Sequence, residues 1–299
     1  MRAELTSYIL EQQMGGKTGT LDVPCPLCGP DRRHPLNRRR KVMRIWRHDP
    51  GFASYHCVRC GASGYARQDC AVNRPVDSVI LMRARAEARE RERQYAIKQR
   101  RKAVWLWRRR RLIIGSIAET YLREVRSYHG RLPATVGFLR ARGEHPPAMI
   151  AAFGVAEEIE PGVVVINDVA VRGIHITKLK LDGSGKADTE RNKIVIGRCV
   201  GSPIVLAPVN DLLGLAICEG IEDALSTYEA TGLGAWAAGA ASRLPGLAKA
   251  IPEYVESLSI LVDDDNAGRQ HSTELARRAA ARGIEVRQID ISGIWRNAA

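Results

Sequence analysis

The sequence predicts a multi-domain α/β protein, and three observations support this prediction. Two Cys-x-x-Cys pairs lie near the N-terminus, which indicates a small metal-held module. A long run without Pro or Gly follows, which indicates an extended helix. In the last third, continuous apolar runs alternate with helical patterns, which is typical of buried parallel strands joined by helices. The expected segments are 1–75, 76–130, 131–209 and 210–299.

The N-terminal half predicts a Cys-rich module and then a long charged helix. Residues 21–64 are rich in Cys, Pro, Gly and Arg and contain short strand-like pieces at 41–46 and 54–57. Residues 78–111 are rich in Ala, Glu, Gln and Arg, so one long helix is expected there. This helix either grips nucleic acid or acts as a linker whose Trp105 and Trp107 pack on the next lobe, and the linker is favoured.

The middle of the chain predicts helices and then an antiparallel sheet. Helices are expected at 116–128, 134–142 and 147–153. β-Branched runs separated by Gly and Asp-Gly turns predict strands at 162–166, 169–181 and 193–196. In the last third, the alternation predicts strands at 212–218, 233–237, 258–262 and 285–289, with helices at 222–229 and 271–281.

Charge is divided unevenly along the chain. The formal net charge is +13, but residues 210–299 hold 8 basic and 13 acidic side chains, whereas residues 1–209 hold 38 basic and 20 acidic ones. A basic body favours a polyanionic partner through counterion release. No apolar run of about 18 residues and no signal-peptide core are found, so no membrane and a cytoplasmic location are expected.

The two Cys pairs predict one structural zinc ion. Cys25, Cys28, Cys57 and Cys60 have the spacing of two turns that supply four thiolates, and four thiolates leave no open position for water. The Gly after each pair suits such a turn through its freedom to adopt positive φ. Three other side chains are weaker candidate ligands: His34, His56 and Cys70. Basic and aromatic residues around the pairs, such as Arg44 and Trp46, either bind single-stranded nucleic acid or form a solvated face.

Carboxylates end two apolar strands in the acidic third. Glu219 follows one strand, and Asp263 and Asp265 follow another. Asp263 and Asp265 project to the same side of an extended chain, while Asp264 points away. Such carboxylates repel one another unless hard divalent cations bind them, so Mg²⁺ (or Mn²⁺) and phosphoryl chemistry are expected.

These residues resemble a known domain. Glu219, Gly220, Asp223, Asp263, Asp265 and Gly268 match the E-G-x-x-D and D-x-D-x-x-G motifs of the Toprim domain of DNA primases, topoisomerases and some nucleases. The order of the segments resembles bacterial-type primases of phages, plasmids and integrated elements. The resemblance implies a zinc ribbon at 1–75, a charged helical linker at 76–130, a basic α+β lobe at 131–209 and a Toprim domain at 210–299.

The resemblance also implies roles for residues. Glu219 would act in nucleotidyl transfer, with Asp263 and Asp265 at the Mg²⁺ sites. A basic lobe would hold template or triphosphate, although each of its basic side chains taken alone is better explained as solvated: Lys178, Lys180, Lys186, Arg191 and Lys193. Expected partners are single-stranded DNA, nucleoside triphosphates and a separate replicative helicase. The helicase is in doubt because the chain ends soon after the Toprim-like segment. The all-Cys zinc pairs and Asn266 also depart from the commonest primase pattern.

Three functions remain open. The leading one is a primase that joins nucleoside triphosphates into a short RNA primer on single-stranded DNA. A Toprim nuclease would use similar acids. A non-catalytic zinc-ribbon accessory protein of replication would bind nucleic acid alone, and a topoisomerase is disfavoured because the chain has no room for gate domains.

Overall fold

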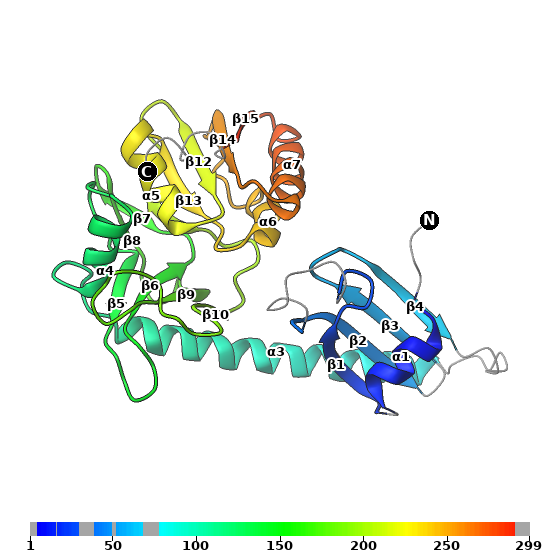
Figure 1. Ribbon diagram of the computed structural model, residues 1–299. Coiled ribbons are helices and arrows are strands. Elements are labelled where there is room, and N and C mark those ends of the chain that lie inside the picture. Colours follow the sequence, from blue (N-terminus) through cyan, green and yellow to red (C-terminus); the bar gives the residue numbers. More distant parts are fainter. Residues whose placement is uncertain (1–4, 16, 30–38, 50–51, 68–77, 291–299) are drawn as a thin grey trace. The chain divides into compact units, whose positions relative to one another are not determined.

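The computed structural model describes residues 5–15, 17–29, 39–49, 52–67 and 78–290. The chain divides into two compact units, Met1–Ala86 (unit 1) and Glu87–Ala299 (unit 2) (Figure 1). The four expected segments stay a prediction. Within the described ranges, no helix has the length and apolar character needed to cross a membrane.

Unit 1 is built on an antiparallel sheet in the order β1-β2-β3-β4. Its strands are β1 (Gly19–Pro24), β2 (Lys41–Asp49), β3 (Phe52–Cys57) and β4 (Ser63–Arg67). The two expected strands are confirmed as parts of β2 and β3. A short helix that the sequence analysis did not predict, α1 (Ser7–Met14), begins at the Thr6 cap and ends at Gly15, whose φ is 55°. Leu10 and Met14 of α1 join the same buried cluster as Met43 of β2.

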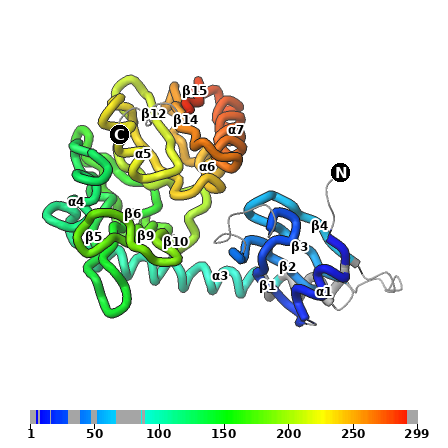
Figure 2. Tube along the Cα trace, in the orientation of Figure 1, coloured from blue at the N-terminus to red at the C-terminus, as the bar shows by residue number. Residues whose placement is uncertain are grey.

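Helix α3 (Ser78–Arg108), which belongs to unit 2 from Glu87 onward, confirms the expected long helix. Its C-terminal half packs on a four-stranded sheet through Ala103 and Trp107, which are fully buried with Ile150 and Ile174 (Figure 2). Trp105 is 45% exposed, and the Arg109 guanidinium lies 3.8 Å from its ring centre. Trp107 therefore packs on the lobe, whereas Trp105 lies at the surface, and the linker interpretation stays a prediction.

The four-stranded sheet has the order β10-β9-β6-β5 and is antiparallel throughout. The strands are β5 (Val136–Leu139), β6 (Ala148–Phe153), β9 (Gly173–Lys178) and β10 (Lys193–Gly197), and a separate hairpin is formed by β7 (Glu157–Glu160) and β8 (Val163–Val165). The expected helix at 116–128 is confirmed as α4 (Ile117–Thr120) and a π-helical turn at Tyr121–Val125.

The helices expected at 134–142 and 147–153 are wrong, because these segments contain strands β5 and β6. All six residues of β6 are buried. Met149, Ala151 and Phe153 face one hydrophobic cluster, whereas Ala148 and Ile150 face the cluster beneath α3. A strand covered on both faces carries no polar alternation, so its short apolar run is not distinguishable from a helix by periodicity.

The C-terminal part of unit 2 contains a five-stranded sheet in the order β11-β13-β12-β14-β15. Strands β12 (Gly214–Cys218), β13 (Gly234–Ala237), β14 (Ser257–Val262) and β15 (Glu285–Asp290) are parallel, and β11 (Ile204–Ala207) is antiparallel to β13. The predicted parallel α/β arrangement is confirmed.

Helices cover both faces of this parallel sheet (Figure 1). Residues of α5 (Ile221–Thr231) pack with Ala216 and Cys218 of β12. On the other face, α6 (Leu244–Leu247) and α7 (Asn266–Ala280) pack with Leu215 and Ile217 of the same strand. The alternating side chains of β12 thus enter two different cores, which explains why the strand is apolar along its whole length.

Candidate functional site

Four cysteine sulfurs come together in unit 1. Cys25 and Cys28 follow β1, while Cys57 ends β3 and Cys60 lies in the turn before β4. Their Sγ atoms all lie within 4.8 Å of one another, and the Cys25–Cys60 and Cys28–Cys57 pairs are each 3.9 Å apart. A tetrahedral zinc ion with Zn–S bonds of about 2.3 Å requires sulfurs about 3.8 Å apart. The four thiols therefore fit a closed zinc site.

Each turn of the cluster needs a glycine, for a different reason at each pair. At Gly61, φ is 69°, in the left-handed region, and its N–H donates to the Cys57 carbonyl at 2.9 Å. At Gly29, a Cβ atom would lie 2.0 Å from the Cys25 carbonyl oxygen. Positive φ, the reason expected from the sequence, therefore applies to Gly61, whereas close backbone approach accounts for Gly29.

The other candidate zinc ligands do not join this cluster within the described residues. His56 is exposed on β3, one residue before Cys57. His34 and Cys70 lie outside the described residues. Burial raises the pKa of the Cys28 and Cys57 thiols to about 11, so a bound cation is needed to keep them as thiolates at neutral pH.

In unit 2, two carboxylates meet at the C-terminal edge of the parallel sheet. Glu219 directly follows β12, and Asp263 directly follows β14. These strands are neighbours, with Ile217 opposite Ile260, so both carboxyl groups emerge at the same edge. The two carboxyl groups lie close enough for each to shift the pKa of the other. This is where open α/β sheets place their sites.

The electrostatics of this edge favour a bound cation. Burial, together with the charges of Asp263 and Asp265, raises the pKa of Glu219 to about 7. Burial and the charges of Asp223 and Asp265 also raise the pKa of Asp263. Raised carboxyl pKa values show that the ionised forms repel one another and are incompletely solvated. A divalent cation would relieve both effects, and hard carboxylate oxygens suit Mg²⁺.

The three consecutive aspartates after β14 have different partners. The Asp265 side chain caps α7, since its Oδ1 accepts a hydrogen bond from the Gly268 N–H at 2.6 Å. Asp264 is exposed and forms an ion pair with Arg269. Among the described residues, the cysteine cluster is the one group of three or more potential metal ligands whose ligand atoms lie within 4.8 Å of one another. The carboxylate oxygens of Glu219, Asp263 and Asp265 are therefore farther apart than the four sulfurs.

The glycines of the two motifs allow close packing at the strand ends. Gly220 caps α5, and a Cβ atom there would lie 2.2 Å from Asp223 Oδ2, so the Asp223 carboxylate folds over this glycine. Arg126 lies 3.6 Å from Asp223 Oδ1. At Gly268, a Cβ atom would lie 2.7 Å from the Asp263 carbonyl oxygen. Each glycine thus lets a helix start immediately beside the carboxylates.

A buried carboxylate that the sequence analysis did not single out connects the lobe to this edge. Glu222 is 3% exposed, and its Oε1 accepts a hydrogen bond from the Tyr121 hydroxyl at 2.9 Å and lies 2.9 Å from Lys186 Nζ. Burial alone would raise the pKa of Glu222, but the charges of Lys193 and Lys186 overcome it and hold the pKa at about 2. Glu222 is therefore ionised and neutralised by the lobe.

The expected basic contacts lie in different surroundings. Lys186 is paired with Glu222, and the charge of exposed Lys193 acts on Glu219 and Asp263. Lys180 is 3.4 Å from Asp188 in a surface ion pair. Lys178 ends β9 half-buried, and Arg191 is exposed before β10. The structure thus brings two of these five side chains to the carboxylate edge.

Arg44 and Tyr55 of unit 1 are engaged within the unit. Arg44 donates two hydrogen bonds to Asp22, at 2.7 and 2.9 Å. Trp46 lies half-buried on β2. Tyr55 is 3% exposed and belongs to the core, so it offers no ring for base stacking.

Comparisons with known proteins identify the C-terminal part of the chain. Residues 214–295 match the family model of the Toprim domain. The C-terminal part of the chain is therefore Toprim-like. It contains Glu219, Asp263 and Asp265, together with the glycines that begin α5 and α7. Residues 97–206 match a second family model, a domain of unknown function (DUF7146).

Other comparisons extend beyond the Toprim domain. The crystal structure of the zinc-binding and RNA polymerase domains of the Aquifex aeolicus primase is similar to this chain at 14% identity and a TM-score of 0.40, covering 91% of this chain and 72% of that one. No curated protein matches the chain. The resemblance to a primase-type protein is confirmed in its two parts, the four-cysteine cluster and the Toprim domain.

Proposed function

We propose that this protein is a DNA primase, which joins nucleoside triphosphates into a short RNA primer on a single-stranded DNA template. The observation that carries the proposal is the pair of mutually repelling carboxylates, Glu219 and Asp263, at adjacent strand ends of a Toprim domain. Such a pair suits a divalent cation and a phosphate-bearing substrate.

In this proposal, Glu219, Asp263 and Asp265 hold Mg²⁺ or Mn²⁺. The ion would supply charge stabilisation for the attacking and leaving oxygens of nucleotidyl transfer. Lys193, whose charge already acts on Glu219 and Asp263, would attract the substrate phosphates to the same edge. Lys186 stays paired with Glu222 and keeps the lobe in position.

The zinc ion in this proposal is structural, and unit 1 binds the template. The four sulfurs close the tetrahedron, so the ion would hold the two turns between β1 and β4 together. A separate helicase and the nucleoside triphosphates remain expected partners. Their identification needs an assay with the purified chain.

A primer-synthesis assay tests the proposed function. Purified protein is mixed with single-stranded DNA, ribonucleoside triphosphates and Mg²⁺, and labelled products are separated by size. We expect oligomers from the wild type and a loss on the order of 100-fold or more in Asp263→Asn, because this change removes a residue that would hold the charge-stabilising ion at the reacting centre.

Asp264→Asn is the matched control, because Asp264 lies one residue away and is paired with Arg269 at the surface. This control should retain nearly full synthesis. No oligomers from the wild type, or equal activity in Asp263→Asn, would refute the primase proposal. Metal-dependent cleavage of the DNA in place of synthesis would instead assign the nuclease function, and binding without either reaction would assign the accessory function.

A further inference from the structure

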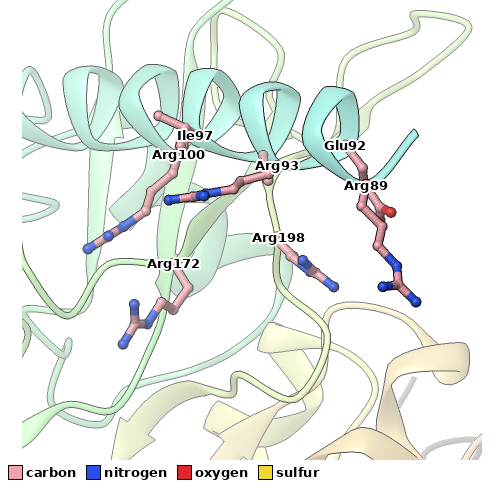
Figure 3. A pocket seen from close by; sticks show the side chains of 8 residues that line it. Arg89, Glu92, Arg93, Ile97, Arg100, Arg172 and Arg198 are labelled. Carbon is pink, nitrogen blue, oxygen red and sulfur yellow. The ribbon is translucent and has the colours of Figure 1, made fainter. Parts of the chain in front are cut away.

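A pocket of about 450 Å³ lies on α3 in unit 2 (Figure 3). Neither Glu219 nor Asp263 is among its lining residues. Its charged lining consists of five arginines and one carboxylate: Arg89, Arg93, Arg100, Arg172, Arg198 and Glu92. The remaining two lining residues are Ala96 and Ile97. The pocket therefore has a strong positive charge and a small apolar part.

The fold brings these arginines together from three places in the chain. Arg89, Arg93 and Arg100 lie on one face of α3 at helical spacing. Arg172 directly precedes β9, and Arg198 directly follows β10. Because Gly173 pairs with Gly197 in the antiparallel ladder, the register of the sheet sets Arg172 and Arg198 at the same end of the hairpin.

The pocket lies on the opposite face of this sheet from the carboxylate site. Ile174 of β9 and Ile150 of β6 pack beneath α3. Their neighbours His175 and Ala151 point to the other face, where the charge of Glu222 acts on His175. A ligand in the pocket would therefore not share the proposed Mg²⁺ site.

The arginines are poorly neutralised by the protein. Arg100 donates hydrogen bonds to the carbonyl oxygens of Val171 and Val169, so its position is set by the backbone. Arg93 has an exposed ion pair with Glu90 at 3.8 Å. For the three other arginines, Arg89, Arg172 and Arg198, no carboxylate oxygen of the described residues lies within 4.0 Å of the guanidinium group. Five guanidinium groups that line one pocket repel one another, and a bound anion would relieve this repulsion.

The chemistry of the lining favours phosphate groups and gives no means to recognise a base. Guanidinium groups bind phosphate oxygens through paired hydrogen bonds. None of the eight lining residues is aromatic or an amide, so the pocket offers neither stacking nor base-edge readout. Exposed basic side chains also lie on other faces of α3, at Arg91, Lys98, Arg101 and Lys102, so basic side chains surround the helix. Basic charge that is not confined to one pocket suits a long polyanion.

From these observations, we infer that the arginine pocket on α3 binds the phosphodiester backbone of a nucleic-acid strand, independently of sequence and of the metal site. The inference rests on the proposed function only in taking nucleic acid as the polyanion. It adds a second place where the chain holds a strand, on the face of the lobe opposite to the carboxylates.

The test is oligonucleotide binding by fluorescence anisotropy without added divalent cations, where no turnover occurs. The main variant is Arg172→Gln with Arg198→Gln, and a second is Arg89→Gln with Arg93→Gln. The control, Arg140→Gln with Arg142→Gln, removes the same charge from exposed residues after β5, outside the pocket. Thermal melting of each variant checks that unit 2 is folded.

We expect each pocket pair to weaken binding of a labelled oligodeoxythymidine by about tenfold or more at roughly 0.1 M salt. The slope of log affinity against log salt should fall by about 1.4, which corresponds to two phosphates at about 0.7 each on a single strand. The control pair should change both quantities much less. The binding assay contains no divalent cation and measures no turnover, so its outcome is independent of the primer-synthesis assay, and a failed primase proposal and a failed pocket proposal are distinguishable.

Either of two results would overturn the inference. In the first, both folded pocket pairs bind the oligonucleotide as tightly as the control pair. In the second, the pocket pairs lose binding of inorganic tripolyphosphate but keep the oligonucleotide affinity and salt slope of the wild type. The second result would assign the pocket to a free polyphosphate instead of a strand.

Discussion

Replacing Lys186 by Met tests the connection between the lobe and the Toprim domain. The change leaves the Glu222 carboxylate, which is 3% exposed, without the ammonium group 2.9 Å away. Removing one partner of a buried ion pair lowers the free energy of unfolding by about 3–5 kcal/mol. The low end applies here because the Lys186 side chain is 27% exposed and Lys193 still acts on Glu222. At about 2–4 °C per kcal/mol, the Tm of unit 2 should fall by roughly 6–12 °C.

The loss should depend on pH in a defined direction. In the wild type, the pKa of Glu222 is about 2, so its stabilisation is present at neutral pH and is lost as the pH falls toward 2. In Lys186→Met, the pKa of Glu222 rises because burial is less compensated. The variant therefore regains relative stability when Glu222 is protonated, and the difference between the two proteins should narrow as the pH is lowered from 7 to about 4.

Urea unfolding at several pH values measures this difference. Lys180→Met is the control, because it breaks a surface ion pair with Asp188, which is 87% exposed, on the same hairpin. The control should change stability little. Lys186→Met combined with Glu222→Gln should recover part of the loss, since no unpaired charge remains buried. Equal urea midpoints for the wild type and Lys186→Met at pH 7 would refute the reasoning, as would a difference that does not change with pH.

Three further predictions concern other parts of the fold. Cys28→Ser should lower the zinc content from about one ion per chain and unfold unit 1, while unit 2 keeps its thermal unfolding transition. Elemental analysis and thermal melting check this, and a folded, metal-free unit 1 would contradict it. Burial and the Lys193 charge lower the pKa of His175 to about 4, so the wild type should lose stability as the pH falls from about 6.5 to about 4. His175→Leu should make the urea midpoint less dependent on pH in this window, and an unchanged dependence would count against the argument. Trp107→Ala should lower the free energy of unfolding, measured in urea, by about 3–5 kcal/mol, because the Trp107 side chain is fully buried. Trp105→Ala should lower it far less, because Trp105 is 45% exposed.

The parallel sheet could be predicted from the sequence because its physical signals are local. Strands β12 and β14 are short apolar runs that end in carboxylates and turn into helices, so their type and direction follow from neighbouring residues. Strand β6 shows where this reasoning fails. Its alanines favour a helix, and burial on both faces removes the alternation that would identify a strand. The deciding contacts, with β5, β9 and α3, are not visible in the local pattern.

The candidate site shows the same division between local and distant information. Glu219 and Asp263 could be predicted because each directly follows a strand. The contact of Glu222 with Tyr121 could not, because the two residues are 101 positions apart. One local signal was present: Glu222 lies three residues before Leu225 on α5, and Leu225 is buried. A carboxylate on the apolar side of a helix requires a buried partner, but the sequence does not identify Lys186 as that partner.

The carboxylates near the edge of the parallel sheet differ in how the protein compensates their charge, and this difference bears on the proposed cation site. Glu222 lies closer to the lobe and is neutralised by Lys186 and Lys193, so its pKa is lowered. Glu219 and Asp263 feel Lys193 as well, but burial and their neighbouring carboxylates outweigh it, so their pKa values are raised. If the basic lobe existed only to balance the acidic domain, all three carboxylates would be compensated. The fold compensates Glu222 more fully than Glu219 and Asp263, and this difference supports the proposal that a cation binds beside the latter two.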